Sequence, residues 1–319
     1  MPSQVLITGS TGFIGRALLA RLASENFHIR ATVRNNIDNN FNKNVKVINV
    51  GELTPSFNWY HALEGVDVVV HLAARVHIMN GKARDLSTEY RRINVDASLN
   101  LAQQAARAGV RRFIYLSSIK VNGEFTQLGQ VFTAEDTPLP QDAYGVSKHE
   151  AELGLRVIAS ETEMEVVIIR PPLVYGPGVK ANFLSMIRWL SHSIPLPLGA
   201  IHNLRSLVAL DNLVDLIVRC IDHPRAANQI FLVSDGEDMS TTSLLYRMGN
   251  ALGMPARLIP VPVPWLHVFA SLLGRQPIAD RICSSLQADI SKTRKVLNWS
   301  PLIDVDEGLR RVAEDFKRK

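Results

Sequence analysis

The sequence has little cysteine and no long hydrophobic run. Only two of its 319 residues are cysteines, Cys220 and Cys283, and neither belongs to a CxxC pair or to a spacing typical of metal ligands. The sequence therefore predicts neither a disulfide-stabilised fold nor a metal site, and we expect a reducing, cytoplasmic environment. No apolar run reaches the roughly 18 residues of a membrane span. The first residues lead directly into an apolar strand, so we expect no signal peptide.

The most apolar segment, residues 258–273, is interrupted by Pro260, Pro262, Pro264 and His267. It is too short and too broken to span a membrane, and two interpretations stay open. It forms a wall of a substrate-binding lobe, which we favour, or it contacts a membrane surface.

Charge of either sign is also sparse. The 35 Lys and Arg against 30 Asp and Glu give a net charge of +5. Basic residues pair at 111–112 and 310–311 but do not interleave with aromatic residues, so we expect no nucleic-acid partner. A small basic excess suits an anionic small ligand. With 46% apolar residues the chain has a sizeable core, and its length suits a two-lobed α/β enzyme.

Strand-length runs rich in Val and Ile alternate with helical patterns through the first half. Because these runs are continuous, they indicate a parallel sheet covered on both faces, and the alternation predicts a Rossmann-type, doubly wound α/β fold. The predicted strands are 4–8, 29–33, 45–50, 66–72, 113–117 and 166–169, and the predicted helices are 12–24, 87–108 and 144–160.

Prolines become frequent after Arg170, and the texture changes to a loop-rich one. We predict a dinucleotide-binding domain over 1–170. Residues 171–319 are predicted to form mainly a smaller α/β substrate lobe, with some segments returning to the first domain. Further helices are expected at 211–222, 240–252 and 304–316, the last one capped by Asp304 or Asp306.

A glycine motif at residues 8–15 closes the first strand and opens the first helix. Its glycines permit a tight turn, close approach of a pyrophosphate and close helix–sheet packing, and the helix N-terminus attracts phosphate. The motif predicts a dinucleotide site in this first βα unit. The predicted contacts are Gly9, Thr11, Gly12, Phe13, Ile14 and Gly15.

The end of the second strand bears on which dinucleotide binds. A carboxylate there would bind the ribose 2′-OH of NAD, but the chain has Arg34 and no acid until Asp38. Arg34 is either a clamp for the 2′-phosphate of NADP or a solvated surface residue. We expect NADP to be preferred and NAD to be possible.

The fourth predicted strand ends at Leu72 and is followed by two small residues. Leu72, Ala73 and Ala74 are expected to lie against the nicotinamide ribose. We expect His71 to be structural rather than catalytic, and the amide of Asn94 to hold a neighbouring strand.

Tyr144 and Lys148 are four residues apart on a predicted helix and share one face. An ammonium near the phenol is expected to lower the pKa of Tyr144 and make it a usable acid or base. Ser118, at the end of the fifth strand, can hydrogen-bond the same substrate oxygen. The three side chains predict a site for carbonyl or hydroxyl chemistry.

In this order, these motifs together with His-x-Ala-Ala at 71–74 and the 170–177 segment are highly specific. They resemble the extended short-chain dehydrogenases/reductases of the nucleotide-sugar epimerase/dehydratase group, over nearly the whole chain. The resemblance implies that Ser118 and Tyr144 polarise and protonate a sugar carbonyl and that Lys148 holds the nicotinamide ribose. It implies a homodimer through helices 87–108 and 144–160. It also implies that Arg205 clamps the substrate diphosphate, whereas Arg281 is a poor match for a second such arginine.

Other positions refine the predicted site. Ile119, Lys120 and Val121 follow Ser118 where dehydratases of this group have an acidic pair, so a 4,6-dehydratase is not expected. Lys120 is a solvated loop residue or a phosphate or sugar contact. Pro171 is a further predicted cofactor contact. The predicted substrate contacts are Ser118, Lys120, Asn182 and Arg205.

Several functions remain open from the sequence. We favour an NADP-dependent 4-reductase of a UDP-linked 4-keto-6-deoxy-N-acetylhexosamine in surface polysaccharide biosynthesis. The main alternative is a UDP-glucose or UDP-N-acetylglucosamine 4-epimerase. A reductase of a hydrophobic ketone and a dinucleotide-binding module without turnover are further alternatives.

Overall fold

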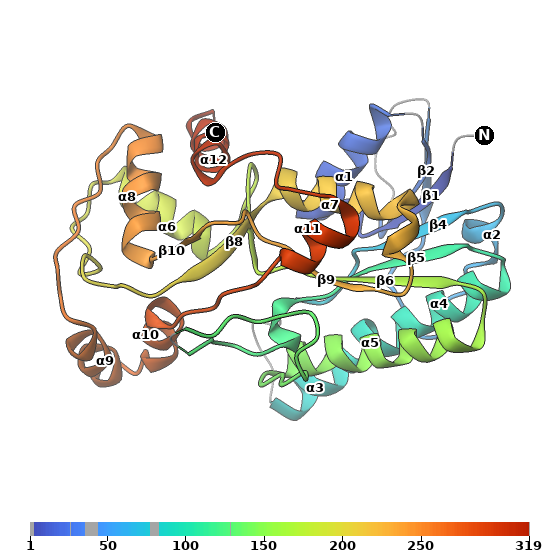
Figure 1. Cartoon of the computed structure of the whole chain (residues 1–319), viewed down its shortest axis with the longest axis horizontal. Coiled ribbons are helices and arrows are strands. Elements are labelled where there is room, and N and C mark those ends of the chain that lie inside the picture. The colour runs from blue at the N-terminus through green and yellow to red at the C-terminus, as the bar shows by residue number, and fades with distance from the viewer. Residues whose placement is uncertain (1–2, 26, 36–43, 77–82, 128, 319) are drawn as a thin grey trace.

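The computed structural model describes residues 3–25, 27–35, 44–76, 83–127 and 129–318. Its main sheet has seven parallel strands in the order β3-β2-β1-β4-β5-β6-β9 (Figure 1). From β1 the strand order runs outward through β2 to β3, and from β4 it runs outward in the opposite direction. A ligand crevice is expected where the order switches, at the carboxyl ends of β1 and β4. The strands are β1 Gln4–Thr8, β2 His28–Val33, β3 Val45–Asn49, β4 Val68–His71, β5 Arg112–Leu116, β6 Glu165–Arg170 and β9 Ile230–Leu232. The predicted doubly wound α/β fold is confirmed.

Helices cover both faces of this sheet (Figure 1). Alternate side chains of the central strands point to opposite faces, so each face has its own buried core. One core lies under α1 Phe13–Ala23, α7 Leu210–Asp222 and α11 Ser291–Leu297. The other lies under α2 Tyr60–Leu63, α4 Ala97–Arg107 and α5 Ala143–Glu161.

The predicted helix over 87–108 is not continuous. It consists of α3 Ala83–Tyr90, a π-helical turn Arg91–Asp96 and α4. Turns of this kind are uncommon and are found frequently at functional sites. Here the turn places Asn94 in the interior, beside the carboxyl end of β4.

A second sheet of three strands, in the order β10-β8-β7, lies beside the first. Its strands are β7 Leu173–Tyr175, β8 Arg205–Ala209 and β10 Asp238–Met239, and it packs with α6 Ala181–Ser191, α8 Thr241–Leu252 and α12 Val305–Lys317 around a third core. Asp304 caps α12 by accepting a hydrogen bond from Glu307 N at 2.8 Å, as predicted.

Two further helices, α9 Val263–Leu272 and α10 Gln276–Cys283, lie together at the end of the molecule farthest from β2 and β3 (Figure 1). Among the described helices, none combines the length and the apolar character needed to cross a membrane.

Candidate active site

The glycine turn between β1 and α1 is tightly packed. Gly9 has a φ of +68°, and a Cβ added there would lie 2.8 Å from Ala73 N. A Cβ on Gly15 would lie 2.1 Å from Gly9 O, so neither position accepts a side chain without movement. The turn is closed by a hydrogen bond from Gly12 N to Gly9 O at 2.9 Å.

The first turn of α1 has no internal partner for its backbone N–H groups. Gly12 is the N-cap and supplies no side-chain acceptor, and the first turn contains no acidic residue. Thr11, Gly12 and Phe13 line a cavity of about 690 Å³, whose lining continues along α1 to Arg21 and onto α12 at Asp315. The cavity lies beside α1, and none of the predicted catalytic residues lines it. The uncapped start of α1 itself fits the pyrophosphate of a dinucleotide.

His71 at the end of β4 has a structural role. Its Nδ1 lies 2.6 Å from Thr8 Oγ1 and its Nε2 lies 2.9 Å from Ser98 Oγ. Burial and the nearby Lys148 lower the pKa of His71 to about 3, so the ring stays neutral. Thr8 Oγ1 also accepts a hydrogen bond from Ala73 N at 3.2 Å. These bonds hold β1 and the segment after β4 in register at the cofactor end.

Asn94 holds a loop and a helix rather than the strand we expected. Its Oδ1 accepts a hydrogen bond from Arg75 N at 2.8 Å, and its Nδ2 donates to Arg75 O and to Ser147 Oγ. The expectation is wrong because the π-helical turn points this amide beyond the end of β4, toward α5. Asn94 therefore fixes the turn before Lys148 against the cofactor end of the sheet.

An ion pair joins the start of α5 to the turn after β5. Asp142 caps α5 by accepting a hydrogen bond from Gly145 N at 2.6 Å, directly beside Tyr144. Its other oxygen pairs with Lys120 Nζ, which also lies 3.3 Å from Glu124. Ser118 begins the turn that contains Lys120. Lys120 therefore links the Ser118 turn to the Tyr144 helix, a role that neither interpretation from the sequence included.

Tyr144 and Lys148 lie on consecutive turns of α5. The Nζ of Lys148 is buried 4.1 Å from the centre of the Tyr115 ring. Burial lowers the pKa of Lys148 to about 7, an effect that the charge of Glu152 opposes. A lysine that is half neutral at pH 7 provides only part of a positive charge.

The expected lowering of the Tyr144 pKa is wrong. Burial, together with Asp142 and Tyr90, raises that pKa. The phenol is therefore protonated at neutral pH, and Lys148 is close to its own titration midpoint.

A buried ion-pair network lies directly behind Ser118. Glu152 accepts hydrogen bonds from Ser117 Oγ at 2.5 Å and from two nitrogens of Arg170 at 3.0 and 2.5 Å. Arg170 also donates to Asn122 Oδ1 at 3.0 Å. This network was not predicted from the sequence; Glu152 is buried on α5 beside Ala151 and Leu155.

The predicted substrate arginine is partly buried at the start of β8. Arg205 Nη1 donates to Arg281 O and Ser284 O, each at 3.0 Å. Burial and the charge of Arg281 lower the pKa of Arg205. The structure thus places Arg281, which we considered a poor match from the sequence, beside Arg205.

The remaining predicted contacts, Pro171, Arg34 and Asn182, lie on three other segments of the chain. Pro171 is buried, and its carbonyl accepts a hydrogen bond from Ile119 N at 3.0 Å, which holds the Ser118 turn against the end of β6. Arg34 is exposed directly after β2. Asn182 lies in the first turn of α6, and its side chain is outside the described part of the structure.

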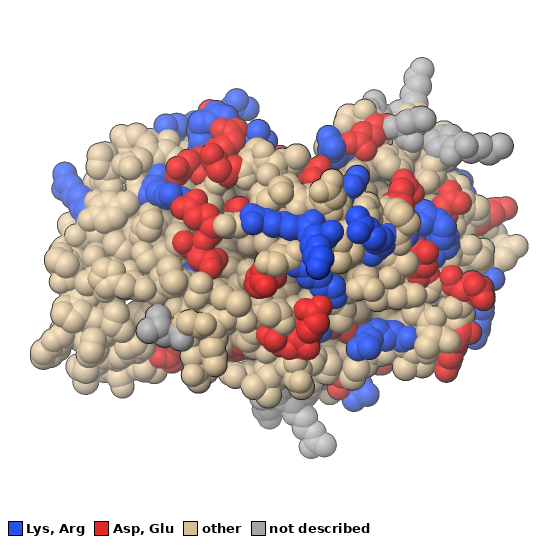
Figure 2. Space-filling model, in the orientation of Figure 1, with Lys and Arg blue, Asp and Glu red and all other residues tan. Residues whose placement is uncertain are grey.

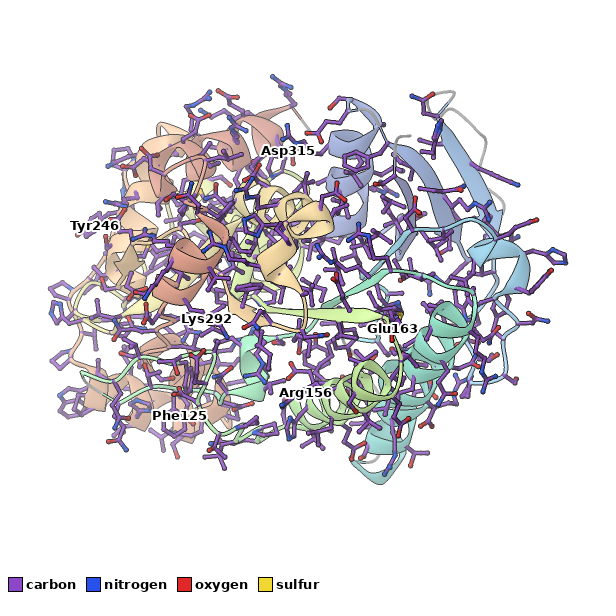
Figure 3. The ribbon with its side chains drawn as sticks, turned by 45° about the vertical axis from the view of Figure 1, so that its right-hand side comes forward. Phe125, Arg156, Glu163, Tyr246, Lys292 and Asp315 are labelled. Carbon is purple, nitrogen blue, oxygen red and sulfur yellow. The ribbon has the colours of Figure 1, made fainter. Side chains whose placement is uncertain are left out.

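A second cavity of about 700 Å³ lies at the β9 edge of the main sheet. Its lining includes Arg156 of α5 and Lys292 of α11 (Figure 3) but none of the three predicted catalytic residues. Among the described residues, no group of three His, Cys, Asp or Glu side chains could hold a metal ion.

Comparison with known proteins places these features in context. The family model described as "NAD dependent epimerase/dehydratase family" matches residues 5–234. A UDP-glucose 4-epimerase of Vibrio cholerae is 47% identical over 318 residues, which is 99% of this chain and 96% of that protein.

Two solved structures have the same fold. MoeE5 in complex with UDP-glucuronic acid and NAD is 25% identical with a TM-score of 0.79. The UDP-glucuronic acid 4-epimerase from Bacillus cereus in complex with NAD is 20% identical with a TM-score of 0.78, a likeness in fold alone. Each match covers 99% of both chains.

Proposed function

The chain belongs to the NAD dependent epimerase/dehydratase family, and we propose that it is a 4-epimerase of a UDP-linked hexose or N-acetylhexosamine. The observation that carries this proposal is the 47% identity, over almost the whole chain, to a UDP-glucose 4-epimerase. The comparisons therefore favour the epimerase that the sequence left as the alternative, rather than the reductase.

The proposed chemistry assigns one role to each of three side chains. The glycine turn would hold NAD, which when bound would accept the hydride of the sugar C4 and return it to the opposite face of that carbon. The Tyr144 phenol takes the proton of the sugar 4-OH and later returns it. Ser118 Oγ donates a hydrogen bond to the same oxygen while it is a carbonyl. Lys148 holds the ribose end of the cofactor, as its position one turn beyond Tyr144 suggests.

Proton transfer needs the raised pKa of the Tyr144 phenol to fall when the site is filled. The positively charged nicotinamide ring of NAD and a protonated Lys148 would both lower the pKa of the phenol. We therefore propose that these two positive charges offset the effect of burial on the Tyr144 pKa and let the phenol act as a base.

Incubation with UDP-galactose and with UDP-N-acetylgalactosamine, followed by chromatography of the sugar nucleotides, tests the proposal. We expect conversion to the 4-epimer with no net change in NADH absorbance. The Tyr144→Phe variant is the matched control. Stoichiometric consumption of NADPH with a 4-keto sugar, and no epimer formation, would overturn the epimerase in favour of a reductase.

One observation keeps the NADP-dependent reductase as a second candidate. The two described residues that directly follow β2 are Arg34, which is exposed, and Asn35, and neither is acidic. The preference for NADP is not supported by the comparisons, since the two solved relatives contain NAD. We propose NAD as the cofactor. Kd values of NADH and NADPH for the wild type and for Arg34→Asp decide this, since a tighter wild-type affinity for NADPH would restore the reductase.

A homodimer remains a proposal. Exposed apolar side chains on α5, at Val146, Leu153 and Val157, support a contact between copies through α4 and α5. Leu153→Glu should convert a dimer to a monomer in light scattering, whereas a wild-type monomer would contradict the proposal.

A further inference from the structure

Acidic residues are distributed very unevenly along this chain. None of its 30 Asp and Glu lies between Val166 and Leu210 or between Met239 and Ala279, whereas these two segments contain seven Lys and Arg. The segments include α6, α8 and α9, which gather at one end of the molecule (Figure 1). Figure 2 shows this end, at the left, as mostly uncharged surface. Of the seven, Arg170 pairs with Glu152 in the main sheet and Arg247 pairs with Glu237, whereas Arg257 and Arg275 are exposed. The end is therefore mostly apolar, with few positive charges.

Helix α9 exposes its apolar residues instead of burying them. Trp265, Val268, Phe269 and Leu272 are 57, 48, 54 and 78% exposed, and no residue of α9 is buried. Their spacing of i, i+3, i+4 and i+7 places them on one face of the helix, and we call them the α9 stripe. A stripe of this kind normally faces a protein core, and here it faces outward.

The surroundings of the α9 stripe extend its apolar surface and add positive charge. Ile259 and Ile278, on either side of α9 in the sequence, are about half exposed. Arg257 and Arg275 are exposed before and after the helix. Tyr246 projects from α8 at the same end (Figure 3). An apolar helix face with Trp and Phe, flanked by arginines, matches the chemistry of an interfacial helix on an anionic bilayer.

We propose that the α9 stripe inserts into the headgroup region of an anionic phospholipid membrane and holds the protein there as a peripheral protein. Charge complementarity favours this occupant over a second copy of the chain. In a two-fold contact the same surface meets itself, and Asp280, which lies 3.3 Å from His267 of α9, is the one acidic residue of 239–283 against four arginines. A second copy would therefore bring an excess of positive charge against positive charge. Anionic headgroups instead supply negative charge.

Flotation of the full-length protein with vesicles tests the proposal. We expect binding to vesicles of phosphatidylcholine and phosphatidylglycerol, weaker binding to phosphatidylcholine alone, and loss of the difference in high salt. The tryptophan emission should shift to the blue on binding, and Trp265→Phe should remove most of this shift.

Paired variants make the test specific. Phe269→Glu combined with Leu272→Glu should lower the partition coefficient at least about tenfold, because it removes apolar insertion and repels anionic lipid. Leu302→Glu, at a residue 61% exposed outside both segments, is the matched control and should bind like the wild type. If the double variant does not fold, Leu272→Ser at the most exposed position replaces it.

Three results would overturn the proposal. The first is absence of flotation with either vesicle, and the second is equal flotation of the wild type and the folded double variant. The third is a loss of molecular mass in light scattering that is confined to the double variant, which would show that the α9 stripe is a contact between copies. None of these results depends on the reaction that the protein catalyses.

Discussion

The half of the molecule that contains the main sheet buries charged side chains, whereas the end that contains α9 exposes apolar ones. Arg112, Lys148, Glu152 and Arg170 are each at most 2% exposed. Arg112 illustrates the pattern, because its guanidinium bonds Glu165 and three backbone carbonyls at 2.7–3.0 Å. No such network occurs among the described residues of α9.

Buried charges and exposed apolar side chains have different consequences for the folded chain. Burying a charge is costly unless its partners are fixed, so each paired charge restricts the positions of the elements around it. Around Ser118 and Tyr144 this restriction gives a defined geometry. The exposed side chains of the α9 stripe do not fix the positions of neighbouring elements in this way. Their apolar surface can still be buried against a binding partner.

In the half that contains the main sheet, removal of the Tyr144 hydroxyl should have the largest effect, and this effect is on kcat. We expect Tyr144→Phe to lower kcat by ~10²–10⁴-fold, since it removes the general acid–base group, while the Kd of NAD stays near the wild-type value. The ring contact with Tyr90 is retained. Steady-state kinetics and a fluorescence titration measure the two quantities. A variant with wild-type kcat would remove Tyr144 from the mechanism.

Breaking the ion-pair network tests whether buried charge fixes the site. Glu152→Gln should lower the free energy of unfolding by about 3–5 kcal/mol, because Arg170 is left buried with an uncompensated charge. It should also lower the pKa of Lys148 further, since Glu152 raises it. Urea unfolding measures the stability. Glu161→Gln, at the exposed end of the same helix, is the control, and equal losses in both variants would contradict the role of the network.

Arg205 lies at the start of β8, beside the end of α10, and its removal should affect substrate affinity alone. We expect Arg205→Ala to raise the KM for the UDP-sugar about ten- to a hundredfold, which corresponds to a charge-assisted bond of ~1.5–3 kcal/mol. The Kd of NAD should not change. Arg188→Ala, on the exposed side of α6, is the control. An unchanged KM would mean that Arg205 only holds the α10 turn.

The smallest predicted effect concerns the pH dependence of stability. The pKa of Lys148 is about 7 in the folded chain, below its ordinary value of 10.5. Between these values the unfolded chain binds a proton that the folded chain does not, so this residue makes stability rise with pH from about 7 to about 10.5. Lys148→Met should lack this rise and should be more stable at pH 7 by about 1–3 kcal/mol. Urea unfolding at pH 7 and pH 9 tests the slope, and parallel slopes would contradict the burial of a neutral lysine.

The sequence was most informative where a local pattern determines structure. All six predicted strands agree with the observed ones within two residues, because buried parallel strands are continuous apolar runs. The glycine motif and the Tyr144/Lys148 spacing likewise depend on short stretches of chain.

Features that depend on distant parts of the chain were not predicted. Glu152 and Arg170 are brought together by packing of α5 against β6. Arg281 reaches Arg205 only because α10 returns to the start of β8. The pKa of Tyr144 depends on how deeply its neighbours bury it, which spacing along a helix does not specify. The prediction of NADP depended on one residue, Arg34, and an exposed arginine does not by itself form a phosphate-binding pocket.

The position of β9 in the main sheet has a consequence for how this protein folds during synthesis. Residues 230–232 pair with β6, and the carbonyls of Cys220, Ile221 and His223 are the partners of the buried Arg112. A nascent chain released only as far as Arg170 therefore has an unpaired sheet edge at β6 and an Arg112 without these acceptors. The site residues up to Lys148 emerge from the ribosome early, yet their framework closes only after residue 232, when more than two thirds of the chain has been synthesised.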